Sequence, residues 1–464
     1  MKKIKLPSIF IYSLPVFIIF SIVLLAYWPG ILVSDSMVQW NQTQTGVFDD
    51  WHPAYNTIYI FLLTKIWNNP GFVLLVQCLI MSLAVGYFFS RLEKYYNVNK
   101  YLLLLAAILF AIIPLNFNFA VTLLKDTLYS TFIIFLTSLV IDIINDKDFF
   151  NKKSKCMFLL FVCLITSLFR HNGVIVVILM AIILMWIYRK EKMVHIIFIS
   201  WLLIYLLMTT VGFKLLNIQE NSYANKYGPI SHIIARMLNT ESVEFSEGEL
   251  EFLSNYVDIE KLKTTYNPYN MDYSINSQNI ESLKESGNEY LRFGVKKILE
   301  NPLIAVKHYV HLTSFLYSPV AFEGSYTVGM FIETDLWVYE DQYPNLDENS
   351  KIPNLLQLLK KVETAYQSNG IEQLTMRPAL YMYLSIIMIS IIAIIKKNKR
   401  IILILFPTIF NTISLAPAIP VAMTRYVYAT MFAFWCFAVW FVYEIYRIIR
   451  EKIKLCRWFK WKIK

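Results

Sequence analysis

The amino-acid sequence predicts an all-α fold, a polytopic bundle of about ten transmembrane helices with juxtamembrane helices and a mostly helical extracytoplasmic domain. Two observations indicate this class. The chain of 464 residues is 57% hydrophobic and only 16% charged, with a mean hydropathy of +0.48, which is rare in soluble globular proteins. Its apolar runs also approach the roughly 20 residues that a helix needs to cross a bilayer.

Ten apolar runs are the predicted spans. The first is too long for a cleavable signal peptide and has no small-residue cleavage site after it, so we expect a retained helix. The fifth is short for a span. The runs cover residues 8–28, 71–90, 101–119, 127–144, 156–170, 173–188, 194–212, 379–395, 401–417 and 426–446.

Basic residues predict the topology, because Lys and Arg collect in cytoplasmic loops. Their clusters fall after alternate spans, so both termini are expected in the cytoplasm of a multi-pass plasma-membrane protein. Segment 213–376 holds 13 Lys and Arg against 22 Asp and Glu, a net charge of −9, and the rest of the chain carries +19. This asymmetry favours an outer position for the acidic segment. It is not the pattern of a nucleic-acid-binding protein.

The spans and loops divide the chain into three regions. An N-terminal transmembrane module, residues 1–212, contains a long first outer loop, residues 29–70. An extracytoplasmic domain, 213–376, is followed by C-terminal spans and a basic cytoplasmic tail, 377–464. Two juxtamembrane helices are expected in the first outer loop, and four helical patterns in the extracytoplasmic domain; in chain order they are 36–45, 53–67, 247–263, 280–300, 302–317 and 353–368.

The first outer loop concentrates chemistry-bearing side chains. Residues 28–53 bring Asp35, Asp49, Asp50 and His52 into one short polar stretch. A carboxylate at the mouth of a membrane cavity is suited to act as a general base, and we expect Asp35 in that role with His52 in substrate binding. The alternative is structural, since Asp is a favoured N-cap and Asp35 could simply begin a helix.

Lys125 and Asp126 lie at the outer end of the fourth predicted span. Asp126 would bring a second catalytic acid close to the first outer loop, and Lys125 would be available to a phosphate group. In the structural alternative Asp126 caps the span, and Lys125 extends its ammonium group to the membrane surface.

Arginines stand at outer positions where the positive-inside rule disfavours them. Arg170 and His171 interrupt the apolar stretch 156–188, and Arg377 and Arg425 precede the eighth and tenth spans. We expect these four residues to bind a phosphate or pyrophosphate, because a guanidinium group donates two parallel hydrogen bonds to such anions. The alternative is contact with lipid headgroups.

Cysteine and histidine patterns indicate neither a disulfide framework nor a zinc site. Four of the five cysteines lie in apolar runs, the fifth lies in the basic tail, and segment 213–376 has none. No Cys/His cluster has zinc spacing. We therefore assign no metal ligand and no certain cofactor, and the need for a divalent cation stays open.

The order of these motifs resembles the glycosyltransferase C superfamily, which includes protein O-mannosyltransferases, aminoarabinose transferases and oligosaccharyltransferases. The resemblance rests on a first span, the acid in Ser34-Asp35-Ser36, two interfacial helices and the second acid in Lys125-Asp126. It covers roughly residues 8–212. Four short motifs resemble more specifically an uncharacterised bacterial family of transferase-like membrane proteins: Pro29-Gly30, Asp35-Ser36, Trp51-His52-Pro53 and Arg170-His171-Asn172.

This resemblance implies a glycosyltransferase that uses a polyprenyl-phosphate-linked sugar as donor. The acceptor would be a cell-surface glycan, a lipid or a protein on the outer face, and membrane lipids would surround the enzyme. The first-loop acid of the superfamily, its catalytic base, maps to Asp35, and the second-loop acid maps to Asp126. Lys125 stands where many relatives carry another acid, which weakens any metal role.

Two other functions remain open. A flippase or exporter of lipid-linked glycans would need a polar path, yet the middles of the spans are almost free of charge. A non-catalytic membrane scaffold would leave the outer Asp, His and Arg residues unexplained. No glycine-rich phosphate loop or alternating strand–helix pattern indicates a nucleotide-sugar fold, and a lipid-borne donor is consistent with this.

Overall fold

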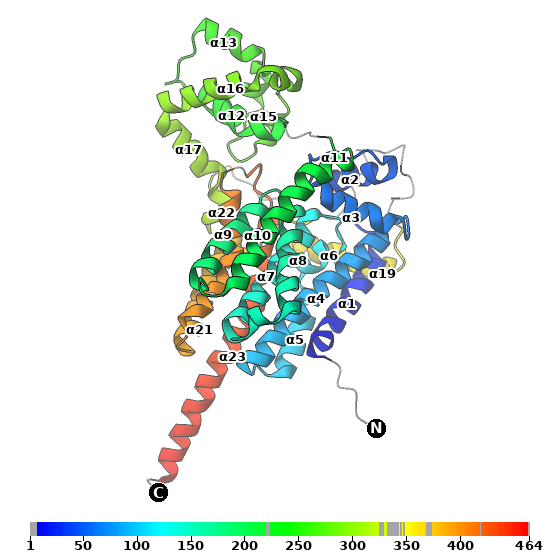
Figure 1. The fold of residues 1–464 in the computed structure, drawn as a ribbon, viewed down its shortest axis with the longest axis vertical. Coiled ribbons are helices and arrows are strands. Elements are labelled where there is room, and N and C mark those ends of the chain that lie inside the picture. The colour runs from blue at the N-terminus through cyan, green and yellow to red at the C-terminus, as the bar shows by residue number, and fades with distance from the viewer. Residues whose placement is uncertain are drawn as a thin grey trace.

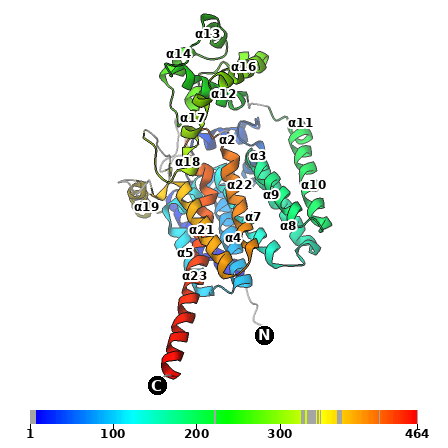
Figure 2. The same cartoon turned by 90° about the vertical axis from the view of Figure 1, so that its left-hand side faces the viewer.

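The computed structural model contains a helical bundle with a smaller helical unit standing on one end, while the C-terminal helix projects from the other (Figures 1 and 2). We call the end that carries the smaller unit the outer end. Every regular element of the described chain is helical. The described residues are 7–219, 223–323, 329–331, 343, 346, 349–367, 374–417 and 419–462, and for 223–225 and 454–462 only the backbone is described.

Six helices in the described part of the chain are long and apolar enough to cross a membrane, or seven if a bent pair counts as one span. A multi-pass helical membrane protein is therefore confirmed, whereas the count of ten spans stays a prediction. The six are α1 (Ser8–Ala26), α4 (Pro70–Tyr96), α7 (Lys125–Asn145), α10 (Lys192–Leu207, continued by η2, Met208–Gly212, and α11, Phe213–Leu215), α21 (Pro378–Ile395) and α23 (Thr424–Lys462).

Shorter helices occupy three further predicted spans. They are α8 (Lys153–Leu168), preceded by η1 (Phe149–Asn151), then α9 (Gly173–Ile187), and finally η5 (Lys399–Leu405) running into α22 (Phe406–Leu415). The predicted span 101–119 is not one straight helix. It is α5 (Lys100–Ile112) and α6 (Pro114–Val121), bent by 66° at Ile113, because the residue before a proline is pushed out of the helical region.

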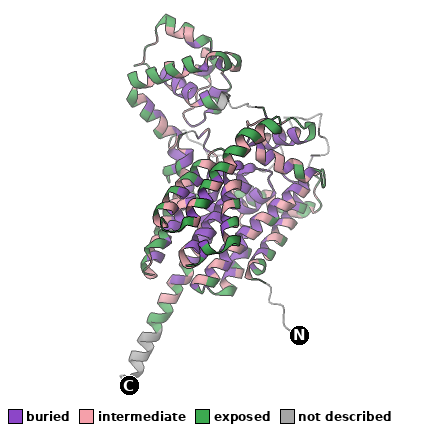
Figure 3. Cartoon of the chain, viewed as in Figure 1, coloured by how far each residue is buried: buried purple, intermediate pink, exposed green. Residues whose placement is uncertain are grey.

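Helix α7 forms the centre of the bundle. Nearly all of its residues are buried, against α4 on one side and α8, α22 and α23 on the others (Figure 3). Its charged residues stand only near its ends, with Lys125 and Asp126 at the outer end and Asp142 at the other. Charge inside a membrane bundle is costly unless it is paired, so each end requires partners.

At the end of the bundle opposite the outer unit, buried acidic residues form ion pairs with basic residues. Asp142 pairs with Arg91 at 3.3 Å and with Lys155 at 3.1 Å, which joins α4, α7 and α8. Glu444 of α23 pairs with Lys396 after α21. Basic loops from distant parts of the chain therefore meet at one end of the bundle, and the side of the membrane that this end faces stays a prediction. The N-terminal residues 1–6 and the tail side chains from 454 onward lie outside the described residues.

The first outer loop contains two short helices, α2 (Ser34–Thr45) and α3 (Ala54–Thr64), which pack on each other. Helix α2 begins two residues earlier than predicted. Its N-cap is Val33, so Asp35 lies inside the first turn and does not cap the helix. The Ser36 hydroxyl donates to the Leu123 carbonyl, which fixes this turn beside the start of α7.

The broken helix α6 ends beside the first outer loop. The Ile31 amide donates to the Val121 carbonyl and the Leu123 amide donates to the Ile31 carbonyl, both at 2.9 Å. Gly30 precedes this contact with φ +117°, and a Cβ there would collide with Leu74, so only glycine fits. The Gln77 side-chain amide donates to three carbonyls at the end of α6, at 2.8–3.1 Å, so protein groups satisfy them at membrane depth.

Residues 223–323 form the outer unit, whose own core lies mainly between α12 and α16. The predicted pattern 247–263 is divided between two helices, 280–300 matches α16, and 302–317 is also divided. The helices are α12 (Tyr223–Leu238), α13 (Glu247–Ser254), α14 (Ile259–Thr264), α15 (Asp272–Ile275), α16 (Ile280–Glu300), α17 (Pro302–Leu312) and α18 (Ser314–Tyr317).

Helix α19 (Pro353–Gln367) corresponds to the predicted pattern 353–368, apart from residue 368, which lies outside the described residues. It packs on α1 and α6 rather than on the outer unit (Figure 1). The buried Glu363 carboxylate accepts hydrogen bonds from the Tyr27 hydroxyl and, at 2.8 Å, from the Asn118 amide. The predicted domain 213–376 therefore combines the outer unit with a helix held on the bundle.

Candidate active site

Five charged side chains from four parts of the chain meet at the outer end of the bundle. Asp35 comes from the first turn of α2, Lys125 and Asp126 from the first turn of α7, Arg170 from the turn between α8 and α9, and Arg425 from the first turn of α23. We call these five residues the ion cluster. Their helices begin or end at the same level, so residues far apart in the sequence become neighbours.

Asp35 accepts hydrogen bonds from two cations. Its Oδ2 lies 2.6 Å from Lys125 Nζ and 2.9 Å from the Arg425 guanidinium. Burial alone would raise the pKa of Asp35, but the charges of Arg425 and Lys125 outweigh burial and hold this pKa well below its usual range. Asp35 is therefore ionised and paired in this structure.

Asp126 and Arg170 form the second pair, with 2.7 Å between Oδ1 and the guanidinium. The Asp126 side chain is only 1% exposed, so this charge depends on its partner. Arg170 also donates to the Tyr426 carbonyl at 3.2 Å and lies over the Tyr426 ring. Arg425 Nε stands 3.9 Å from Asp126 Oδ2 and connects the two pairs.

The two histidines predicted for this site lie in different places. His52 is buried, and its Nδ1 lies 3.3 Å from Lys125 Nζ. Burial, followed by the charge of Lys125, lowers the pKa of His52 to about 3, so the neutral ring accepts from Lys125. His171 instead lies 3.3 Å from Asp50, with most of its ring exposed, and is outside the ion cluster.

Arg377 precedes α21 and is buried. Its guanidinium lies 5.9 Å from the centre of the Phe315 ring of α18, which places it where the outer unit meets the bundle. Of the predicted site residues, Asp35, His52, Lys125, Asp126, Arg170 and Arg425 are thus brought together. His171 and Arg377 have other neighbours.

One acidic residue near the site did not emerge from the sequence. Asp272, at the start of α15 in the outer unit, lies close enough to Arg425 and Asp35 to interact with both charges. Its side chain reaches water, yet the surrounding protein desolvates it and raises its pKa; Asp35 acts in the same direction and Arg425 opposes. Residues 267–272 contain asparagines typical of turns, but no motif that indicates a site.

The cluster carries a net positive charge, since Lys125, Arg170 and Arg425 face two carboxylates. Because this buried cluster has one more cation than it has carboxylates, it can bind an anion whose charge balances the excess. Nowhere in the described part of the chain do three or more His, Cys, Asp or Glu side chains form a group suited to a metal ion.

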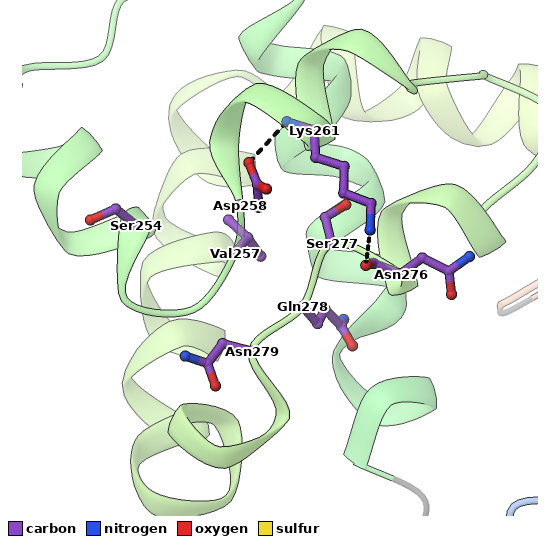
Figure 4. A pocket seen from close by; sticks show the side chains of 8 residues that line it. All are labelled: Ser254, Val257, Asp258, Lys261, Asn276, Ser277, Gln278 and Asn279. Atoms are coloured by element: carbon purple, nitrogen blue, oxygen red, sulfur yellow. Dashed lines mark hydrogen bonds between the residues drawn. The ribbon is translucent and has the colours of Figure 1, made fainter.

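The outer unit has a separate polar hollow of about 350 Å³ (Figure 4). Lys261 reaches across it and donates to the Asn276 carbonyl at 2.9 Å. No residue of the ion cluster lines the hollow, so it does not belong to the candidate active site. Its lining consists of Ser254, Val257, Asp258, Lys261, Asn276, Ser277, Gln278 and Asn279.

A sequence model described as "Family of unknown function (DUF6020)" matches residues 39–290, more than half of the chain. The protein belongs to this DUF6020 family. No curated protein and no solved structure matches the chain. Of the residues at the site, Asp35 and Arg425 lie on either side of the part that the DUF6020 family describes. The others fall within it: His52, Lys125, Asp126, Arg170 and Asp272.

Proposed function

We propose that this protein is a membrane glycosyltransferase that moves a sugar from a polyprenyl-phosphate donor to an acceptor at the outer membrane surface. The observation that carries the proposal is the ion cluster, in which three cations face two carboxylates where the bundle meets water. The resemblance of residues 8–212 to the glycosyltransferase C superfamily points in the same direction.

The charge of the ion cluster suits such a donor. A polyprenyl-phosphate sugar is a phosphodiester with one negative charge, which the excess cation would balance. When the bond between sugar and phosphate breaks, the leaving phosphate gains a second negative charge. Arg170, Arg425 and Lys125 would stabilise this developing charge, and electrostatic stabilisation of this kind often contributes more to catalysis than any other effect.

The reaction proposed is a single displacement. The acceptor oxygen gives up its proton to a base and attacks the anomeric carbon, while the bond from that carbon to the phosphate oxygen breaks and its electron pair leaves with the lipid phosphate. One displacement inverts the anomeric configuration. While it is paired with Lys125 and Arg425, Asp35 is a weak base, so in this state it mainly holds the two cations in place.

The first test is binding of undecaprenyl phosphate to purified protein in detergent. Wild type should bind it, and Arg425→Gln should bind at least tenfold more weakly, since a hydrogen bond to a charged group contributes about 1.5–3 kcal/mol. Arg292→Gln changes an exposed arginine of the outer unit and is the matched control. Equal binding by wild type and Arg425→Gln would contradict the anion site.

The second test follows the reaction itself. Undecaprenyl-phosphate-linked glucose, mannose and arabinose, each radiolabelled in the sugar, are incubated with the protein and a membrane extract as acceptor. A transferase releases undecaprenyl phosphate and moves the label to another product. Movement of the intact lipid across proteoliposomes without cleavage would instead identify a flippase, and neither activity with any donor would favour a scaffold.

A further inference from the structure

A turn of the outer unit contacts the bundle directly beside the ion cluster. We call residues 267–275 the docking turn. The Met271 amide donates to the Pro420 carbonyl at 2.7 Å, and Asn270 forms a bridge with Val421, in the segment that leads to Arg425. On the other side, Met271 and Ile275 pack with Trp51 of the first outer loop. The docking turn is thus held between the two segments that supply Arg425 and His52.

Asp272 follows Met271 in this turn, and its environment differs from that of the other two acids. Asp35 and Asp126 are occupied by cations at 2.6–2.9 Å. Within the described ranges, Asp272 has no cation within ion-pair distance, and its side chain reaches water. The charged or titratable groups that act on it or respond to it are Arg425 and Tyr426 of α23 and Asp35 of α2.

We infer that Asp272 is the general base of the proposed transfer, supplied by the outer unit to a site whose other charged groups belong to the bundle. This inference rests on the proposed function. The acceptor hydroxyl transfers its proton to the Asp272 carboxylate, its oxygen forms the new bond to the anomeric carbon, and the electron pair of the broken bond leaves on the lipid phosphate. The proton then passes from Asp272 to water.

The electrostatic environment supports this division of roles. A general base must accept a proton during the transfer. Two close cations stabilise the ionised form of Asp35, so Asp35 is a weak base. Desolvation by the surrounding protein raises the pKa of Asp272; Arg425 opposes this and the charge of Asp35 adds to it, so Asp272 is the stronger base of the two. Its side chain also reaches water, the side from which a soluble acceptor would arrive.

The test compares Asp272→Asn with wild type, Asp35→Asn and Asp258→Asn. Asparagine serves at a helix start as well as aspartate, so a role of Asp272 in starting α15 would survive the change. Asp258 caps α14 in the hollow of Figure 4 and is the matched control. Turnover of undecaprenyl-phosphate sugars and affinity for undecaprenyl phosphate are measured for each protein, together with melting temperature.

Asp272→Asn should lose roughly 10²–10⁴-fold in kcat, as expected for a general base, with lipid-phosphate affinity within about twofold of wild type. The acid limb of the pH–rate profile should disappear, and Asp272→Glu should restore part of the rate. Asp258→Asn should match wild type in every measurement.

Turnover of Asp272→Asn within threefold of wild type would overturn the inference while the proposed function stands. So would a loss that accompanies equal losses of binding and melting temperature. If Asp35→Asn alone removes the acid limb, Asp35 is the base instead. If wild type cleaves none of the lipid-phosphate sugars, the proposed function fails and the role of Asp272 fails with it.

Discussion

Arg425 in the first turn of α23 donates to Asp35 in the first turn of α2 over 2.9 Å. The two residues stand near opposite ends of the sequence, and both lie outside the residues that match the DUF6020 family. Their ion pair joins the first outer loop to the last long helix. The candidate site is therefore a property of the assembled bundle and not of any one segment.

Cysteine labelling tests the predicted topology. Ser242→Cys lies in an exposed turn of the outer unit, and Lys399→Cys lies at the exposed start of η5 at the opposite end. In intact cells, a membrane-impermeant maleimide should label the first and not the second. Cys78, Cys156, Cys163 and Cys436 are buried, so a Cys456→Ser background suffices. Labelling in the reverse pattern would place the outer unit in the cytoplasm.

Asp35→Asn should bind undecaprenyl phosphate more tightly than wild type, by about tenfold. The variant removes an internal anion that competes for Lys125 and Arg425, and releasing one charge-assisted hydrogen bond is worth about 1.5–3 kcal/mol. Lipid titration in detergent measures this affinity. Melting temperature is checked as well, because Lys125 and Arg425 lose a carboxylate partner. Weaker binding by a folded Asp35→Asn would contradict the competition and would mean that the phosphate site needs Asp35 to hold the two cations in place.

Arg170→Lys should weaken undecaprenyl phosphate binding by roughly 10- to 150-fold. Lysine keeps the charge but loses the planar fork of the guanidinium. In this structure one nitrogen of that fork, Nη1, contacts both Asp126 and the Tyr426 carbonyl. The same titration is run with Arg292→Lys as control. Unchanged affinity in Arg170→Lys would show that Arg170 is not part of the phosphate site, because lysine contacts lipid headgroups equally well.

Glu363 should make stability depend on pH. Burial raises the pKa of Glu363 to about 7, above its ordinary value of 4.5, although Tyr27 and Asn118 oppose the shift through hydrogen bonds. Between these values the folded protein keeps a proton that the unfolded chain has released, so stability falls as pH rises through this window. The full effect is about 3 kcal/mol, at 1.36 kcal/mol per pKa unit.

Glu363→Gln removes this titration, so its stability relative to wild type should increase from pH 5 to pH 8. Thermal unfolding in detergent at both pH values measures the difference. Glu289→Gln, at an exposed position on α16, controls for loss of a carboxylate. A constant difference between Glu363→Gln and wild type at the two pH values would show that Glu363 does not titrate in this window.

Apolar runs predicted most of the bundle, because each helix must be long and apolar enough to meet the bilayer on its own. Features that depend on partners were harder to predict. The bend at Ile113-Pro114 divides a run whose hydropathy is continuous, and the Asn116 side chain satisfies the Phe110 carbonyl that the bend frees. Helix α19 has a clear helical pattern, but its place against α1 depends on Glu363, Tyr27 and Asn118.

The candidate site divides in the same way. Asp35 could be predicted because it stands in a short loop rich in chemistry-bearing side chains. Lys125, Asp126, Arg170 and Arg425 could be predicted because a charge at the outer end of an apolar span is unusual enough to require a partner. His171 satisfied the same rule, yet it lies beside Asp50. Asp272 could not be predicted, since it stands in an acidic polar segment where a carboxylate is ordinary. Its place near Asp35 and Arg425 depends on the contact of the docking turn with Pro420.

The hydrogen bonds of Gln77 bear on membrane permeability. Three carbonyls at the end of α6 are satisfied by one side chain, beside the strand-like contact of Ile31 with Val121. No chain of water molecules is required there to hydrate the backbone. The broken helix therefore lies inside the bundle without adding a hydrated path for protons at this point.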